Sequence, residues 1–203
     1  GRIYQAWGKY EEAIAQHEQS RDLYQQLGKE TDVAASWYWI AACYRDWSKY
    51  EEAITAQREA LALREKLDDQ PRIALAYYQF GRIYQAWGKY EEAIAQHERS
   101  RKIYQALELI QKEANQLSWL ADCYRHIENY AIAAEHYRKS AEQHQAINHL
   151  ESTAKNLCQL AKTRLLQAKN APPGQAKTYL QEAEHNLQEA IQINTAGDYQ
   201  QNL

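Results

Sequence analysis

Histidine is the residue type in this chain that comes nearest to forming a chemical site. Four histidines, His126, His136, His144 and His149, stand close together in the sequence. A zinc-binding helix of the H-E-x-x-H type uses two histidines on one helical face with an acid to support them. The spacings here are ten, eight and five residues, so the pattern predicts no metal site and no bound cofactor.

Acidic side chains recur in pairs that could in principle act as general acid and base. Adjacent glutamates stand at three places, Glu11–Glu12, Glu51–Glu52 and Glu91–Glu92. Each pair falls where we expect a helix to begin, and the helix dipole favours negative charge there. The sequence holds neither a phosphate-binding glycine loop nor a G-x-S-x-G motif. We therefore predict that these 203 residues contain no enzyme.

Charge and composition argue against several other classes of protein. The formal net charge is -3, whereas nucleic-acid-binding domains are usually strongly basic. No apolar run approaches the roughly 18 residues of a membrane-spanning helix. The three cysteines are an odd number and no secretory signal is present, which favours the reducing cytoplasm. We expect neither a nucleic-acid partner nor a membrane partner.

The elements that must position any site are near-copies of one another. Residues Gly81–Glu98, GRIYQAWGKYEEAIAQHE, repeat Gly1–Glu18 letter for letter, and Ala41–Ile54 keeps the same skeleton halfway between them. The period is therefore 40 residues. A fixed period of this size is typical of solenoids, in which each unit buries its apolar face against its neighbours. Because Gly1 falls inside a repeat, we interpret the chain as a piece of a longer protein.

Each full unit is predicted to contain two helices joined by a short turn. Residues spaced by three and four along 71–84 indicate the first helix of the third unit, and Gly88 is the expected turn residue. Prolines within 170–174 predict an extended loop in the last unit. The predicted units are 1–30 (truncated), 31–70, 71–110, 111–150 and a polar capping unit 151–194, followed by a frayed tail, 195–203.

Small residues recur at 40-residue intervals where helices must approach closely. One such column holds Ala34, Ala74, Ala114 and Ala154, and a second-helix column holds Ala13, Ala53, Ala93 and Ala133. Larger residues alternate with them, as in the column Ile40, Phe80, Leu120 and Leu160. Small residues facing large ones predict interdigitated packing between neighbouring helices.

The repeat resembles the tetratricopeptide repeat (TPR), on the positions Gly81, Tyr84, Gly88, Tyr90, Ala93 and Ile94. Its 40-residue spacing is similar to that of kinesin light chains and Pins-type adaptors. The resemblance implies an all-α fold, an α-solenoid in which antiparallel helix pairs form one right-handed superhelical array over residues 1–203. It also implies a scaffold or sensor that binds other proteins through a concave groove.

In such arrays the groove is lined by one strip of the first helices. Helical phase and the 40-residue step place the following candidate residues on it: Tyr38, Trp39, Arg45, Tyr78, Gln79, Arg82, Gln85, Asn115, Trp119, Asp122, Arg125, Lys155 and Lys162. Together with Arg2, the basic side chains outnumber the aspartates Asp46 and Asp122. An excess of positive charge on the strip of a chain whose net charge is negative predicts an acidic peptide or protein segment as the partner.

Alternatives remain open at this stage. Trp39 and Trp119 either anchor a ligand or pack against the next unit. The array could instead serve as a spacer or self-association module, with a homodimer formed through the open half-unit at Gly1. A further alternative is a regulatory repeat region of a larger nucleotide-hydrolysing protein.

Overall fold

The computed structural model describes the backbone of residues 1–201 and the side chains of residues 1–195. This part of the chain is all-α, with helices and no strand. It divides into two compact units, Gly1–Ile103 and Tyr104 onward. The helices, in order, are α1 (Arg2–Ala6), α2 (Tyr10–Gln26), α3 (Glu30–Asp46), α4 (Tyr50–Lys66), α5 (Gln70–Ala86), α6 (Tyr90–Ala106), α7 (Ile110–His126), α8 (Tyr130–Ala146), α9 (Leu150–Lys169) and α10 (Pro173–Gln201).

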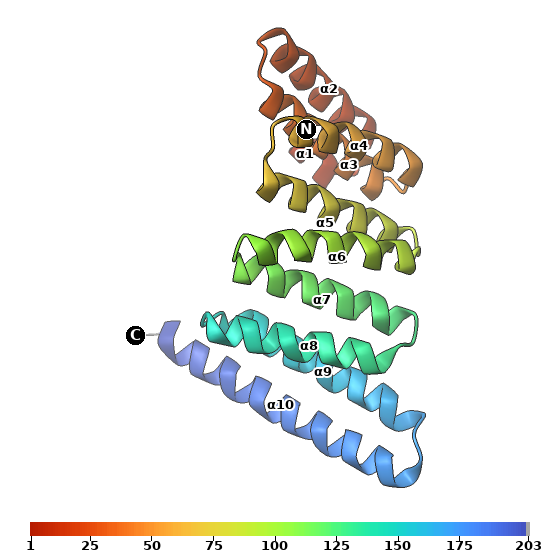
Figure 1. Ribbon diagram of the computed structural model, residues 1–203, viewed down its shortest axis with the longest axis vertical. Helices are drawn as coiled ribbons and strands as arrows, with labels where there is room; N and C mark the ends of the chain where they lie inside the picture. Colours follow the sequence, from red (N-terminus) through yellow and green to blue (C-terminus); the bar gives the residue numbers. More distant parts are fainter. Residues whose placement is uncertain (202–203) are drawn as a thin grey trace. The chain divides into compact units, whose positions relative to one another are not determined.

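Helices α2 to α8 are 17 residues long and are separated by three-residue turns. The first helices of the full units begin within one residue of the predicted unit boundaries. In Figure 1, α3 and α4 of the first unit and α7 and α8 of the second run antiparallel, as such short turns require. The first and second helices of these units have the same length, 17 residues.

The turns share one backbone conformation, with positive φ at the middle residue. In the turn after α5, Gly88 has φ 78°, its N–H donates to Gln85 O (3.0 Å), and Lys89 N–H donates to Tyr84 O (2.9 Å). These two bonds form a Schellman motif and satisfy carbonyls that the helix leaves open. The middle positions recur every 20 residues, at Gly8, Gly28, Ser48, Asp68, Gly88, Glu108, Glu128 and Asn148.

Substitutions at this turn position should therefore have opposite effects. Glu128, with φ 60°, occupies a conformation that costs an L-residue about 1–2 kcal/mol. We expect Glu128→Gly to raise the unfolding free energy by about 1 kcal/mol and Gly88→Ala to lower it by about 1 kcal/mol. Thermal unfolding of both variants beside the wild type measures this. A Gly88→Ala protein as stable as the wild type would contradict the turn assignment.

The predicted small-residue columns lie in the interior. Ala13, Ala53, Ala93 and Ala133 are each 0% exposed. The column of larger residues packs against these alanines. Ile40 lies with Ala13 in one buried cluster of the first unit, and Leu160 lies with Ala133 in a buried cluster of the second unit. The interdigitated packing predicted from the columns is present within each unit.

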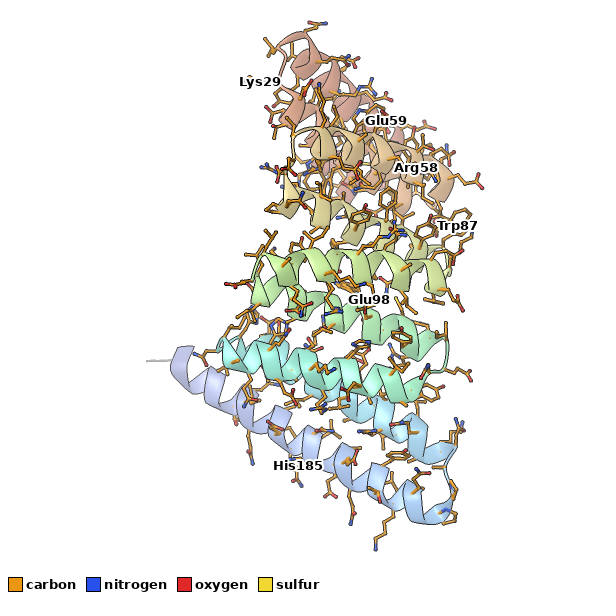
Figure 2. All side chains as sticks on the ribbon, in the orientation of Figure 1. Lys29, Arg58, Glu59, Trp87, Glu98 and His185 are labelled. Atoms are coloured by element: carbon orange, nitrogen blue, oxygen red, sulfur yellow. The ribbon has the colours of Figure 1, made fainter. Side chains whose placement is uncertain are left out.

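Aromatic residues cover the turns. Trp87, labelled in Figure 2, stacks on Tyr50 with ring centroids 5.7 Å apart, and the Lys89 ammonium lies 3.5 Å from the Trp87 ring centroid. Trp47 repeats the arrangement one unit earlier with Tyr10 and Lys49. Each turn of this type is thereby held to the preceding second helix.

The last helix pair differs from the prediction. Helix α9 continues to Lys169, so the loop before α10 is shorter than expected, because Pro173 fits the first turn of a helix, where no N–H is needed. The expected tail from 195 is helical as far as Gln201, and residues 202–203 lie outside the described part. The capping unit was predicted to be polar, but its helix α10 also exposes three apolar side chains, those of Leu180, Leu187 and Ile191.

Candidate functional site

The predicted strip of the first unit forms one hydrogen-bonded network across α3 and α5. Gln79 donates from Nε2 to the Tyr38 hydroxyl (2.6 Å) and accepts from Arg45 Nη1 (3.1 Å). Arg45 also forms an ion pair with Asp46 at 2.6 Å, and Gln5 donates to the other oxygen of that carboxylate at 2.7 Å. The Arg45 side chain is 15% exposed, so its guanidinium is held in place before any ligand arrives.

The remaining strip residues of the first unit are held in the same way. Arg82 donates from Nη1 to the Tyr78 hydroxyl (2.9 Å), with its guanidinium carbon 5.9 Å from the Tyr78 ring centroid. Gln85 Oε1 lies 3.2 Å from Nε2 of His97, which is fully buried. Because these side chains are partly buried and bonded to one another, the strip presents an ordered polar surface with a basic excess.

The strip of the second unit centres on Asp122. The Tyr137 hydroxyl donates to Asp122 Oδ1 at 2.5 Å, and Arg125 Nη2 donates to the same oxygen at 3.3 Å. Burial and the Asp122 charge raise the pKa of Tyr137, so its hydroxyl stays protonated and remains a donor. Asp122 Oδ1 is therefore engaged by two donors, and its charge is offset by Arg125.

A cavity of about 120 Å³ lies beside this network, between α7, α8 and α9. Four predicted strip residues line it, namely Asn115, Trp119, Asp122 and Lys155. Lys162 is exposed on α9 and does not line the cavity. The second unit thus brings together most of its predicted residues around one small hollow.

Trp39 is neither fully exposed nor part of the buried core. Its ring lies 6.2 Å from that of His17 in a stacked arrangement, 5.0 Å from the perpendicular Tyr38 ring, and 5.1 Å from the Arg2 guanidinium carbon. Side chains of its own unit therefore cover part of it. Trp119 is likewise half-buried, but it lines the cavity of the second unit.

Sequence reasoning did not assign the second-helix residues Arg64, Tyr137 and His144 to the strip. Arg64 is 4% exposed, and its Nε and Nη1 have no hydrogen-bond partner among the described residues. Burial, followed by the positive charge of Arg72, lowers the pKa of Arg64. Arg64 and His144 occupy one column, filled by tyrosine at Tyr24 and Tyr104. That change of residue type within a column was the available signal.

The histidines that stand close together in the sequence pack against other rings. His136 stacks on Tyr124, with ring centroids 5.5 Å apart, and His144 lies 5.3 Å from His149 in a tilted arrangement. Over the described residues, no three histidine, cysteine, aspartate or glutamate side chains are grouped so that they could hold a metal ion. Helices of this part of the chain are also too short or too polar to cross a bilayer.

Burial of His144 makes stability depend on pH. Its side chain is 1% exposed, and burial together with His149 lowers the pKa of His144 below its ordinary value near 6.5. As the pH falls through that value, the unfolded chain takes up a proton that the folded chain does not. We expect the unfolding free energy to fall towards acid by up to about 1.4 kcal/mol per pH unit for this group.

Denaturant titrations between neutral and mildly acidic pH measure that dependence. His144→Tyr, which places the residue of Tyr104 in the same column, should flatten the pH profile. The pKa of His17 is also lowered, by burial and the positive N-terminus, so some slope should remain. A profile unchanged by His144→Tyr would mean that the ring is accessible to water.

Two larger hollows lie away from the strip. One in the first unit, about 440 Å³, has Trp37 and Leu63 among its lining, with Lys29 and Glu59 (both labelled in Figure 2) at its polar edge. The other, about 420 Å³, lies between α8, α9 and α10 and includes His185, also labelled there. Charged side chains of both signs line each hollow, so neither favours a ligand of one charge.

Comparison with known proteins bears directly on this fold and strip. Residues 32–106 match the model of the tetratricopeptide repeat family. A crystal structure of a kinesin light chain-type protein of Podosopora anserina, with nearly identical TPR-like repeats, covers 97% of this chain and 92% of its own, at 20% identity and a TM-score of 0.73. Residues 32–106 therefore carry the tetratricopeptide repeat, and the fold of the chain is similar to that of TPR-like repeat proteins.

Two further solved structures are similar to this chain in fold. A Rap protein complexed with competence and sporulation factor matches 96% of this chain and 62% of its own, at 18% identity and a TM-score of 0.64. A signal transduction ATPase with a tetratricopeptide repeat sensor, from Pyrococcus horikoshii, matches 93% of this chain but only 34% of its own, at 17% identity and a TM-score of 0.63. No curated protein sequence matches the chain significantly.

The family and the fold support a module for protein–protein interaction. TPR proteins are generally scaffolds rather than enzymes. The strip gives this chain a polar surface on which arginine, tyrosine and amide side chains are ordered by hydrogen bonds.

Proposed function

We propose that this chain binds an acidic peptide or protein segment along the strip. The observation that carries the proposal is the ordering of its basic side chains. Arg45 and Arg82 are fixed by Gln79 and Tyr78 in the first unit. A guanidinium already held in position loses little conformational freedom on binding, so its contacts contribute more to affinity.

Charge supports an acidic partner. In the first unit, the strip carries Arg45 and Arg82 but one carboxylate, Asp46, which already pairs with Arg45. In the second unit, Lys155 and Lys162 are exposed. A basic strip on a chain of net charge -3 attracts an acidic segment mainly through association rate and specificity.

A salt series on a complex with a labelled acidic peptide tests the charge argument. We expect the affinity for a glutamate-rich peptide to fall steeply as ionic strength rises, because exposed charges are screened over about 10 Å at 0.1 M salt. The glutamine version of the peptide is the matched control. Equal affinity for both peptides at low salt would contradict the proposal.

Self-association is a second candidate, favoured by the apolar residues of α1. Ile3 is 67% exposed and Trp7 is 68% exposed, whereas Ile83, which has the same sequence around it, is 1% exposed in a cluster with Ala53 and Ile54 of α4. The face of α1 therefore fits a helix like α4 from another copy of the repeat. Sedimentation at several concentrations tests this, and Ile3→Glu should abolish any concentration dependence.

A further inference from the structure

The cavity of the second unit contains a buried side chain whose polar atoms are unsatisfied. His144 on α8 lines this cavity and is 1% exposed. Neither Nδ1 nor Nε2 of His144 has a hydrogen-bond partner among the described residues. Buried ring nitrogens are normally bonded, because leaving them unpaired costs the full desolvation penalty. The structure therefore points to something in the cavity that bonds to His144.

Three of the polar groups around the cavity can donate a hydrogen bond and have no partner among the described residues, namely those of Asn115, His144 and Lys155. Lys155 is exposed and makes no ion pair with the described residues, and the Asn115 amide likewise has no hydrogen bond to them. The one carboxylate of the lining, Asp122, accepts from Tyr137 and Arg125 through Oδ1, and the Arg125 guanidinium offsets its charge. An ammonium, an amide and an imidazole without partners suit a ligand that accepts hydrogen bonds and carries negative charge.

We propose that this cavity takes the carboxylate of an aspartate or glutamate side chain of the bound partner. Lys155 supplies the opposite charge, Asn115 donates from its amide, and His144 donates one ring N–H from below. The inference rests on the proposed function, since it names the subsite that reads one acidic residue of the segment. It adds a second-helix residue to a strip otherwise drawn from first helices.

Size and chemistry disfavour other occupants. A water molecule takes up about 30 Å³ in the liquid, so a cavity of about 120 Å³ holds a few waters or one short polar group, and no folded element. A cationic group would meet Lys155 at close range. An apolar group would leave both nitrogens of His144 unsatisfied.

Nuclear magnetic resonance of protein labelled with ¹⁵N at histidine tests the subsite. The probe is a capped Gly-Glu-Gly tripeptide, its control is capped Gly-Gln-Gly, and His144→Tyr assigns the ring signals. We expect the glutamate peptide to shift the His144 ring nitrogens in a saturable manner and the glutamine peptide to do so at least tenfold more weakly. Inorganic phosphate, added as a competitor at the same concentration as the glutamate peptide, should not displace that peptide and should not reverse the shift of the His144 ring nitrogens.

Two lysine variants separate the subsite from general charge attraction. Lys155→Gln should weaken the response to the glutamate peptide about tenfold, which corresponds to the loss of one charged contact. Lys169→Gln, at the exposed end of α9, removes the same charge away from the cavity and should leave the response unchanged. Equal weakening by both variants would overturn the assignment.

The response of the His144 ring to the glutamate peptide does not depend on the strip residues of the first unit. A protein carrying Arg45→Gln and Arg82→Gln should keep the His144 response even if it no longer binds a longer acidic segment. Failure of the proposed function and failure of the subsite are therefore distinguishable. If the His144 ring signals do not move up to the solubility limit of the glutamate peptide, or if phosphate displaces it, the cavity is no carboxylate site.

Discussion

Replacing Gly81 with alanine is expected to lower the unfolding free energy by about 1–3 kcal/mol, a large effect for one methyl group. A Cβ added at Gly81 would lie 2.5 Å from both Cε1 and Nε2 of His97. The imidazole cannot move aside easily, because it is fully buried and lies 3.2 Å from Gln85. The absence of a side chain at Gly81 is therefore what admits the ring of His97.

The chain itself supplies the compensating change. One unit earlier the same two positions hold Ala41 and Gln57, and Gln57 is fully buried with its amide bonded to Ala76 O at 3.2 Å. We expect Gly81→Ala combined with His97→Gln to recover most of the lost stability. Urea unfolding of the two single variants and the double variant gives the coupling free energy. Additive effects would mean that the two residues do not determine each other.

The second large effect is expected at Arg64, in the opposite direction. Its guanidinium is buried, and two of its nitrogens have no hydrogen-bond partner among the described residues. An unpaired buried charge destabilises the folded state, and an uncharged side chain of similar size removes that cost. Arg64→Tyr should raise the unfolding free energy by about 1–3 kcal/mol. Tyrosine fits, because Tyr104 in the same column is 4% exposed.

The reciprocal substitution is the matched control. Tyr104→Arg buries a charge where the wild type has none, so it should destabilise the protein by a comparable amount. Denaturation midpoints of the two variants and the wild type, measured at the same pH and salt, decide the matter. If Arg64→Tyr destabilises the protein instead, the guanidinium makes a contact that keeps it favourable in the folded state.

The fold was predictable because several independent patterns agree. The 40-residue period, the alanine columns and the glycine at position 88 each indicated helix pairs, and the structure contains them. The turns at Ser48 and Glu128 were less visible, because their residues do not favour positive φ. Position in the repeat, rather than residue type, identifies them.

The end of the chain was harder to predict for a local reason. The prolines near 172 suggested a longer break, yet Pro173 begins α10 because a helix tolerates proline in its first turn. The residues of α10 match no other copy of the repeat, so the 40-residue period did not indicate that Leu180 and Ile191 are exposed.

The strip was predictable only in part. Helical phase selected Arg45, Arg82 and Asp122 on first helices, but it gave no account of their partners. The partner of Asp122 is Tyr137, which comes from a second helix and lies 15 residues away in the sequence. Contacts between helices depend on packing geometry, which a period of 40 residues leaves unspecified.

Affinity capture with the triple variant Arg45→Glu, Arg82→Glu and Arg125→Glu tests the central claim most directly. The matched control changes three exposed basic residues off the strip, Arg58, Lys102 and Lys177, to glutamate. Circular dichroism and thermal unfolding establish that each protein is folded, and the triple glutamine variant serves if the glutamate variant is not.

The account predicts that the wild type and the control retain the same acidic protein and that the strip variant loses it. Retention of that protein by all three would contradict binding along the strip. Retention of only further copies of the chain, by all three, would instead favour the self-association alternative.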